Sequence, residues 1–229
     1  MSHQSLTESI NAASRASGLP IHKIVSNVKR CGTGLGRKYV DDFITEACLL
    51  SKKIKEPVKV TWSREDEMEQ DMLNPAGVYR VKASLNKEGQ LTGWKMRTAS
   101  DGQLSVAAQE PPIGLIENYE GEWDSIANNV RRGAWRGPQH NTASWVIQSF
   151  LNELAYAADK EPLDFLLELF SRKDAQRLTT WPYPILQYSR LREMLRKVAR
   201  EADYGRQMSE NWGQGAAIYH TFSSTCAHV

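Results

Sequence analysis

The sequence predicts an α+β fold with a mixed sheet and packed helices. Apolar side chains recur with helical spacing in several segments and alternate with polar side chains in others, so both periods occur in one chain. Of the 229 residues, 41% are apolar and 24% are charged, which is typical of a globular protein and not of a disordered one. The length suits one large domain or two small ones.

The first third predicts a strand, a glycine loop, a helix and a second strand. Residues 24–30 are β-branched and partly alternating, and residues 58–62 alternate after Pro57. Between them, apolar side chains at positions 40–54 recur at i, i+3, i+4 and i+7, which places them on one helix face. Such a crossover favours two neighbouring parallel strands.

A β-hairpin is predicted next, because alternating residues flank a turn at residues 86–89. Residues 100–132 show no sustained period and predict a long ordered loop or a short strand pair. From residue 141 onward, helices are predicted over residues 143–158, over residues 163–171 after Pro162, and over residues 186–202.

A strand is predicted within residues 212–222. Residues 225–229 are still apolar, which favours a piece of a larger fold, with a short C-terminal strand as the alternative. We expect two regions, residues 1–100 with the glycine loop and hairpin and residues 101–229 with the later helices, both parts of one larger domain.

Charge and cysteine content exclude several classes of protein. Lys and Arg number 29 and Asp and Glu 27, so the net charge of +2 argues against a chain-wide nucleic-acid surface. No apolar run approaches the ~20 residues of a membrane span, and residues 1–9 lack the pattern of a signal peptide. The three cysteines and five histidines show no metal-ligand spacing, so we expect no metal ligands.

The first candidate site is the run Gly32-Thr33-Gly34-Leu35-Gly36. Bare backbone at a glycine lets a ligand approach, and N–H groups at a helix start can bind an anion. Basic residues flank the run, but it matches neither a Walker loop nor the GxGxxG fingerprint. A tight turn with solvated charges is the structural alternative.

The second candidate site is residues 133–141, where Trp135 and Arg136 lie between two glycines. An arginine can bind an oxyanion or stack on an aromatic ring. The alternative is that Trp135 is a core anchor and Arg136 pairs with a carboxylate. The acidic residues 64–67 are interpreted as a helix start with Ser63 as N-cap, because nothing near them would desolvate a catalytic carboxylate.

Several of these segments, in this order, resemble one known family. Residues 32–38, 57–66, 133–137 and 149–155 are similar to the molybdopterin-binding large subunit of molybdenum hydroxylases. The resemblance is greatest to the branch formed by the beta subunits of isoquinoline 1-oxidoreductases, with aldehyde oxidases and xanthine dehydrogenases as more distant kin. It covers nearly the whole chain.

The resemblance implies a molybdenum–molybdopterin cofactor, in bacteria usually the cytosine dinucleotide form, and hydroxylation of an aldehyde or N-heterocycle with oxygen from water. It implies an iron–sulfur small subunit as partner. By position, Gly32, Gly34, Leu35 and Gly36 match the family's cofactor loop, and Trp135 and Arg136 match its aromatic–arginine pair. A non-catalytic module that binds a phosphate ester or a protein through the same basic loop is the alternative.

Some positions depart from the family pattern. Thr33 and Leu35 replace a glycine and a phenylalanine of the loop, and Gln148 and Asn152 replace two acids of the later helix motif. The family's general-base glutamate lies in a Gly-Glu-Pro-Gly type segment that this sequence lacks. We therefore expect an internal fragment, with no catalytic residue of its own and no activity in isolation. The resemblance leaves the compartment open between cytoplasm and periplasm.

Overall fold

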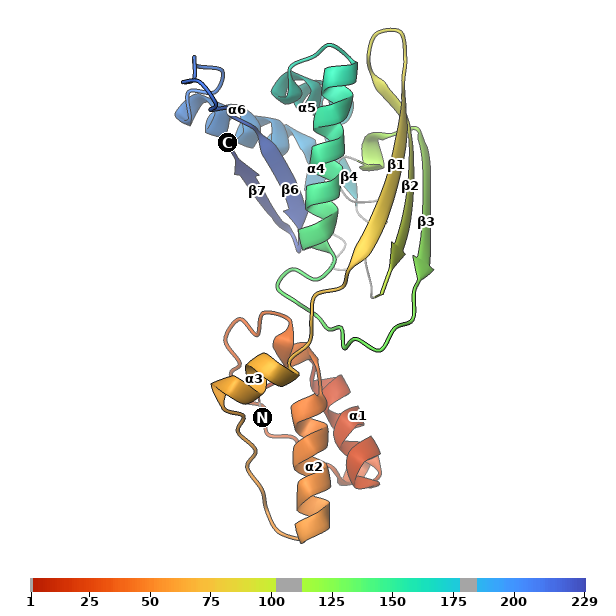
Figure 1. Cartoon of the computed structure of the whole chain (residues 1–229), viewed down its shortest axis with the longest axis vertical. Coiled ribbons are helices and arrows are strands. Elements are labelled where there is room, and N and C mark those ends of the chain that lie inside the picture. Colours follow the sequence, from red (N-terminus) through yellow and green to blue (C-terminus); the bar gives the residue numbers. More distant parts are fainter. Residues whose placement is uncertain (1, 102–112, 178–184) are drawn as a thin grey trace. The chain divides into compact units, whose positions relative to one another are not determined.

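The computed structural model describes residues 2–101, 113–177 and 185–229. It confirms the α+β class, with helices, one three-stranded sheet and two short strand pairs. The chain divides into two compact units (Figure 1). Of the described residues, unit 1 contains those up to 76, Asp101 and residues 126–138, and unit 2 contains the rest. Residues 77–100, the expected hairpin, thus belong with the later helices.

Unit 1 is built on two packed helices, α1 (Leu6–Ser17) and α2 (Asp42–Ile54). Helix α1 is absent from the sequence-based predictions, although its signal is present. Ser5 caps its first turn by accepting a hydrogen bond from the Glu8 N–H, at the spacing of a capping box. Gly18 ends it in a left-handed conformation, with φ of 81°.

The two strands predicted on either side of α2 are wrong. Residues 24–30 contain only irregular backbone, and Val25 and Val28 are exposed. In residues 58–62 the side chains of Val58, Val60 and Trp62 are half-buried in alternation, as a strand would have them, but no strand among the described residues pairs with this backbone. A strand needs such a neighbour to pair with its N–H and C=O groups. Alternating burial of side chains therefore does not by itself make this segment a strand.

The short helix α3 (Arg64–Gln70) confirms the structural interpretation of the acidic cluster. The Ser63 side chain accepts a hydrogen bond from the Asp66 N–H, and the Asp66 carboxylate accepts one from the Ser63 N–H. This is a capping box, which satisfies two N–H groups that a helix start otherwise leaves unpaired. These residues therefore stabilise a helix end.

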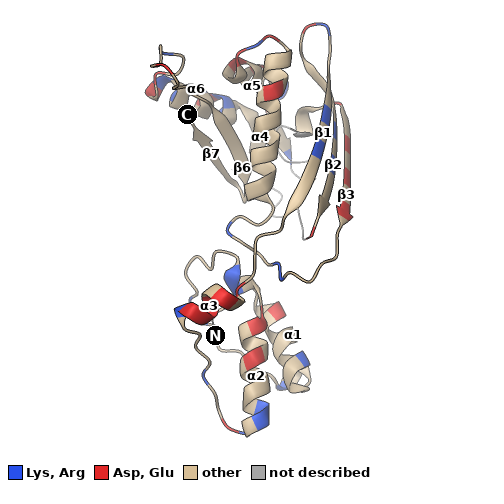
Figure 2. Cartoon of the chain, in the orientation of Figure 1, with Lys and Arg blue, Asp and Glu red and all other residues tan. Residues whose placement is uncertain are grey.

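Unit 2 contains the sheet, in the order β1-β2-β3. Strands β1 (Gly77–Leu85) and β2 (Leu91–Ser100) form the predicted hairpin, antiparallel and in register from Gly77–Ser100 onward. Strand β3 (Asn118–Ser125) pairs parallel with β2, within the stretch where a loop or strand pair was predicted. Figure 2 shows acidic residues along β3, and Glu120, Glu122 and Asp124 form ion pairs with Lys95 and Arg97 of β2.

The helices α4 (His140–Ala157), α5 (Pro162–Phe170) and α6 (Tyr188–Glu201) confirm the helical predictions, with Pro162 in the first turn of α5. Helix α4 lies along the sheet in Figure 1. One hydrophobic cluster joins β2, α4, α5, α6 and β6, and it includes the fully buried side chains Met96, Ile147, Leu151, Phe165, Phe170 and Leu195. Phe150 is only partly buried at the margin of this cluster.

Short strand pairs complete unit 2. Strands β4 (Ala175–Arg177) and β5 (Ile185–Gln187) pair with each other, as do β6 (Ala217–Thr221) and β7 (Ser224–His228). The strand predicted within residues 212–222 is thus confirmed as β6, and the terminal residues form the short strand that was the alternative. The proline linker at residues 181–184 lies outside the described residues.

Candidate functional site: a glycine loop beside an exposed arginine

The glycine loop lies in unit 1 and needs its glycines. Gly32, Gly34 and Gly36 all have positive φ, of 64°, 64° and 84°, a conformation that costs most other residues energy. Leu35, with φ of 52°, adopts such a conformation without being glycine. The backbone therefore curls through four left-handed positions within five residues.

The loop does not open directly into a helix, contrary to the prediction. A short 3₁₀ turn, Arg37–Tyr39, follows Gly36, and α2 begins only at Asp42. The N–H groups of the α2 start are thus separated from the loop. Backbone donors for an anion at the loop therefore come from the loop itself and not from the start of α2.

Two of the loop's N–H groups already have acceptors. The Leu35 N–H closes a tight turn on the Thr33 carbonyl oxygen at 2.7 Å, and the Gly36 N–H donates to Oε1 of Gln4 at 3.1 Å. No acceptor in the described part of the chain meets the N–H groups of Gly32, Thr33 and Gly34. The free donors are therefore the N–H groups of Gly32, Thr33 and Gly34, whereas those of Leu35 and Gly36 are occupied.

The second candidate segment contacts the glycine loop directly. A side-chain carbon added at Gly36 would lie 2.7 Å from the carbonyl oxygen of Ala134 and 3.1 Å from the backbone nitrogen of Trp135. Glycine is thus required for this approach. Two segments far apart in the sequence, both singled out from it, are brought together within unit 1.

Trp135 and Arg136 are both exposed at this contact. Trp135 is 50% exposed, so it is not the core anchor of the structural alternative. Within the residues that the structure describes, no carboxylate pairs with Arg136. Beside Arg136, Gly137 has open space where a side chain would stand. The segment therefore presents an aromatic surface and an unpaired cation to solvent.

An ion-pair network fixes the exit from the loop. Arg37 donates two hydrogen bonds to the Asp42 carboxylate, at 2.9 and 3.0 Å, and pairs with Asp71 through its Nε at 2.7 Å. Arg131 pairs with Asp42 at 3.2 Å. Burial raises the pKa of Asp42, but its hydrogen bonds and ion pair with Arg37 outweigh burial and hold that pKa below its usual value.

This network ties the loop to α2, to the end of α3 and to the segment that leads to Arg136. Leu73 and Gly133 reinforce the last connection, because the Gly133 N–H donates to the Leu73 carbonyl oxygen at 3.3 Å. The loop and the arginine segment are therefore held by the same scaffold. No pattern in the sequence indicates this network, since its members are scattered along unit 1.

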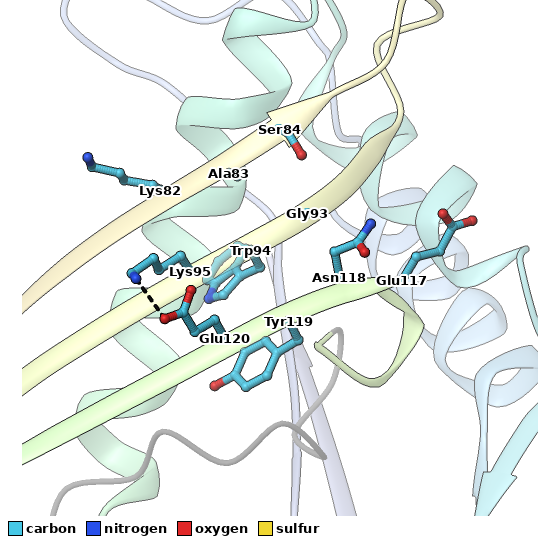
Figure 3. Close-up of a pocket in the computed structure, with 10 residues that line it drawn as sticks. All are labelled: Lys82, Ala83, Ser84, Gly93, Trp94, Lys95, Glu117, Asn118, Tyr119 and Glu120. Atoms are coloured by element: carbon cyan, nitrogen blue, oxygen red, sulfur yellow. Dashed lines mark hydrogen bonds and ion pairs between the residues drawn. The ribbon is translucent and has the colours of Figure 1, made fainter.

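A separate groove lies on the exposed face of the sheet in unit 2, lined by Lys82, Lys95, Asn118 and Glu120 among others (Figure 3). Gly93 leaves its floor without a side chain. The Lys95 ammonium is bound to the Glu120 carboxylate at 2.7 Å, so this part of the groove is internally neutralised. The groove shares no residue with the glycine loop.

Gln148 and Asn152, which stand where the family's helix motif has two acids, have different surroundings. Gln148 is buried in α4 and its Oε1 accepts the N–H of Ile218 at 3.3 Å, which connects α4 to β6. Asn152 is exposed on the same helix. Both lie in unit 2. A neutral amide at position 148 thus has a structural role in this chain.

Neither metal ligands nor membrane spans are found in the described segments. No group of three or more His, Cys, Asp or Glu side chains there is arranged to hold a metal ion. None of the helices within those segments is long and apolar enough to cross a membrane.

Comparison with known proteins identifies the family. The model of the molybdopterin cofactor-binding domain matches residues 1–168. The chain is 25% identical to the beta subunit of isoquinoline 1-oxidoreductase from Brevundimonas diminuta over 93% of its own length and 27% of that protein's. It is 28% identical to a nicotinate dehydrogenase subunit of Pseudomonas putida, over 59% of its length and 13% of that protein's.

Solved structures share the fold. The aldehyde oxidoreductase of Desulfovibrio gigas superposes with a TM-score of 0.68 at 14% identity, over 92% of this chain and 25% of that one. The chain thus spans about a quarter or less of these relatives. With the family model matching well over half of the residues, the chain belongs to the molybdopterin cofactor-binding domain family.

Proposed function

We propose that the chain supplies part of the binding site for a molybdenum–molybdopterin cofactor, through the glycine loop and through Trp135 and Arg136. The observation that carries this proposal is the contact of Gly36 with Ala134. It places a loop with free N–H donors beside a segment with an unpaired arginine. Gly32, Gly34, Leu35, Gly36, Trp135 and Arg136 are the residues we assign to the cofactor.

The residues present suit such a group. The cofactor carries phosphate, and unpaired backbone N–H groups and an arginine are the donors that phosphate binds best. Gly32 has open space where a side chain would stand, so a ligand can approach its backbone. The exposed indole of Trp135 offers a flat apolar surface for a planar ring.

We further propose that the protein containing this chain is an oxidoreductase that hydroxylates an aldehyde or an N-heterocycle with oxygen from water. The bound cofactor would supply the redox chemistry. In this chain, Arg136 would stabilise negative charge that develops on the reacting group, because its guanidinium has no carboxylate partner among the described residues. Trp135 would shield that charge from water.

The remaining parts of the proposal rest on family resemblance and on relatives. Two relatives are named as subunits, which supports an iron–sulfur small subunit as partner. We assign the cytosine dinucleotide form to the cofactor and the general base to a glutamate in a segment downstream of these residues. We expect these 229 residues alone to be inactive.

The test compares Arg136→Ala and Arg136→Lys with the unchanged protein in its complete, cofactor-loaded form. Arg80→Ala is the matched control, because Arg80 lies on β1, outside the loop's unit. The measurements are molybdenum and pterin content, and turnover of an N-heterocycle and an aldehyde with a dye acceptor.

We expect Arg136→Ala to lower kcat by roughly 10²-fold, with Arg136→Lys intermediate and Arg80→Ala unchanged. Undiminished turnover and cofactor content in Arg136→Ala would return Arg136 to a structural role. Phosphate-ester binding without molybdenum or pterin in the unchanged protein would favour the non-catalytic alternative.

A further inference from the structure

Unit 2 contains a cavity that the proposed function does not use. It has a volume of about 500 Å³ and lies where α4 packs beside the β6–β7 hairpin (Figure 1). The hairpin and the segment before it supply one part of the lining, and α4 supplies residues three and four apart, which share one helix face. Those on α4 are Ser144, Trp145, Gln148, Ser149 and Asn152. Because the whole lining belongs to unit 2, the cavity is independent of the glycine loop.

Gln148 brings an unpaired hydrogen-bond donor to this cavity. Its side chain is only 9% exposed, and its Oε1 accepts the Ile218 N–H. Its amide nitrogen, Nε2, meets no acceptor in the described part of the chain. Buried donors in folded proteins nearly always have a partner, so this one indicates an acceptor that a ligand would supply. We therefore expect the ligand to carry an oxygen acceptor such as a carbonyl group.

Cys226 and His228 form a thiol–imidazole pair at the same cavity. They are two residues apart on β7, so their side chains share one face of the hairpin, and Sγ of Cys226 lies 2.9 Å from Nε2 of His228. Both residues are exposed. A thiol becomes a strong nucleophile when a neighbouring base takes its proton, and an imidazole with its own proton on Nδ1 can do so here.

Much of the remaining lining is apolar. Trp145 is 69% exposed, and Ala216, Ala217 and Ile218 contribute further apolar surface. A cavity with apolar walls and few polar groups binds an apolar body and uses the polar groups to orient it. The exposed indole favours a flat aromatic body.

We propose that this cavity binds small aromatic α,β-unsaturated carbonyl compounds, which modify Cys226 covalently. Such compounds combine an aromatic body for Trp145, a carbonyl oxygen for Nε2 of Gln148 and a soft electrophilic carbon for the thiol. A bond forms between Sγ and the β-carbon as the π bond of the carbon–carbon double bond breaks. The amide of Gln148 stabilises the charge that develops on the carbonyl oxygen.

The reaction is a net addition. The thiol proton passes to His228 and from there to the α-carbon, so no group leaves. No oxidant or reductant is required. Cys226 and His228 supply the nucleophile and the base, and the compound supplies the only other atoms.

The test treats the 229-residue chain with benzylideneacetone and measures the thioether adduct at each cysteine by peptide mass spectrometry. Cys31 and Cys48 are internal controls, because both are half-buried and lie outside the cavity. Benzylacetone, which has the ring and the carbonyl group without the double bond, should form no adduct. Iodoacetamide, which lacks the aromatic body, reports the reactivity of the thiol itself.

Three variants separate the cavity from the thiol. Trp145→Ala removes the aromatic surface, and Gln148→Glu removes the donor but keeps an oxygen that accepts the Ile218 N–H. Trp212→Ala is the matched control, because Trp212 is 73% exposed and does not line the cavity. Far-UV circular dichroism checks that each variant is folded, and Trp145→Ala, at an exposed position, keeps the test decisive if Gln148→Glu misfolds.

We expect benzylideneacetone to modify Cys226 about tenfold faster or more than Cys31 and Cys48. Trp145→Ala and Gln148→Glu should each slow this reaction by about tenfold and leave the reaction with iodoacetamide little changed, while Trp212→Ala affects neither reagent.

His228→Gln should slow both reagents at Cys226 by about tenfold or more, because the base is lost. His22→Gln is its matched control, since His22 is exposed in unit 1, and should change neither rate.

Equal rates at the three cysteines would overturn the proposal, and so would unchanged rates in His228→Gln. If Trp145→Ala reacts with benzylideneacetone as fast as the unchanged chain, Cys226 is an exposed thiol without a ligand cavity, which also contradicts the proposal.

Discussion

Replacing Gly36 by alanine tests whether the loop and the arginine segment are in contact. The residue has φ of 84°, which costs an L-amino acid about 1–2 kcal/mol. Its new side-chain carbon would also stand 2.7 Å from the Ala134 carbonyl oxygen. Because the obstacle is backbone and not the end of a flexible side chain, relief requires a backbone shift, at a further cost of about 1–3 kcal/mol.

Gly32→Ala is the matched control for Gly36→Ala. It has φ of 64°, so it carries the conformational cost, but nothing lies within 4 Å of the added carbon. We therefore expect Gly36→Ala to lower the free energy of unfolding by about 1–3 kcal/mol more than Gly32→Ala does. Urea unfolding followed by tryptophan fluorescence measures both. Equal urea midpoints for the two variants would refute the contact between Gly36 and Ala134.

Three further predictions concern stability. Phe165→Ala should cost about 3–5 kcal/mol by leaving a cavity in the core of unit 2, whereas Tyr156→Ala, at an exposed position of α4, should stay within about 0.5 kcal/mol in the same urea titration. Burial, and secondarily Arg190, lowers the pKa of His220, so the folded state resists protonation. Stability should fall as the pH drops below about 6.5, and His220→Gln should lessen that loss. Ser63→Ala should cost about 0.5–2 kcal/mol by removing the N-cap of α3, which hydrogen exchange at the Asp66 amide would detect.

Much of the fold could be predicted because periodicity reports burial. Helices α4, α5 and α6 each bury one face against a common core, and the β1–β2 hairpin alternates about a short turn. Strand β3 could not be predicted this way. Its outward carboxylates are matched by Lys95 and Arg97 across a parallel pairing, and a pairing between distant segments leaves little local pattern.

The two wrong strand predictions have the same physical cause, which is that strand pairing depends on distant segments. Residues 24–30 and 58–62 have the composition of strands, but whether a strand forms depends on a partner elsewhere in the chain. In residues 58–62, alternate side chains are half-buried although no partner strand is present among the described residues. Trp62 instead donates a hydrogen bond to Glu46 on α2 and lies beneath the Arg37 guanidinium.

Candidate site residues could be predicted from the sequence only where an unusual combination of residue types occurs. Three closely spaced glycines, and an arginine between a tryptophan and a glycine, stand out in any chain. Gln4 does not, because one glutamine in a polar N-terminal segment carries no pattern. Its side chain accepts a hydrogen bond from the Gly36 N–H across the loop, which only the folded chain reveals.

A structure of the complete protein with its cofactor bound would test the central claim most directly. It should place the N–H groups of Gly32, Thr33 and Gly34, together with the Arg136 guanidinium, about 3 Å from oxygen atoms of the cofactor. A cofactor bound out of reach of both the glycine loop and Arg136 would contradict the claim that these segments form part of its site.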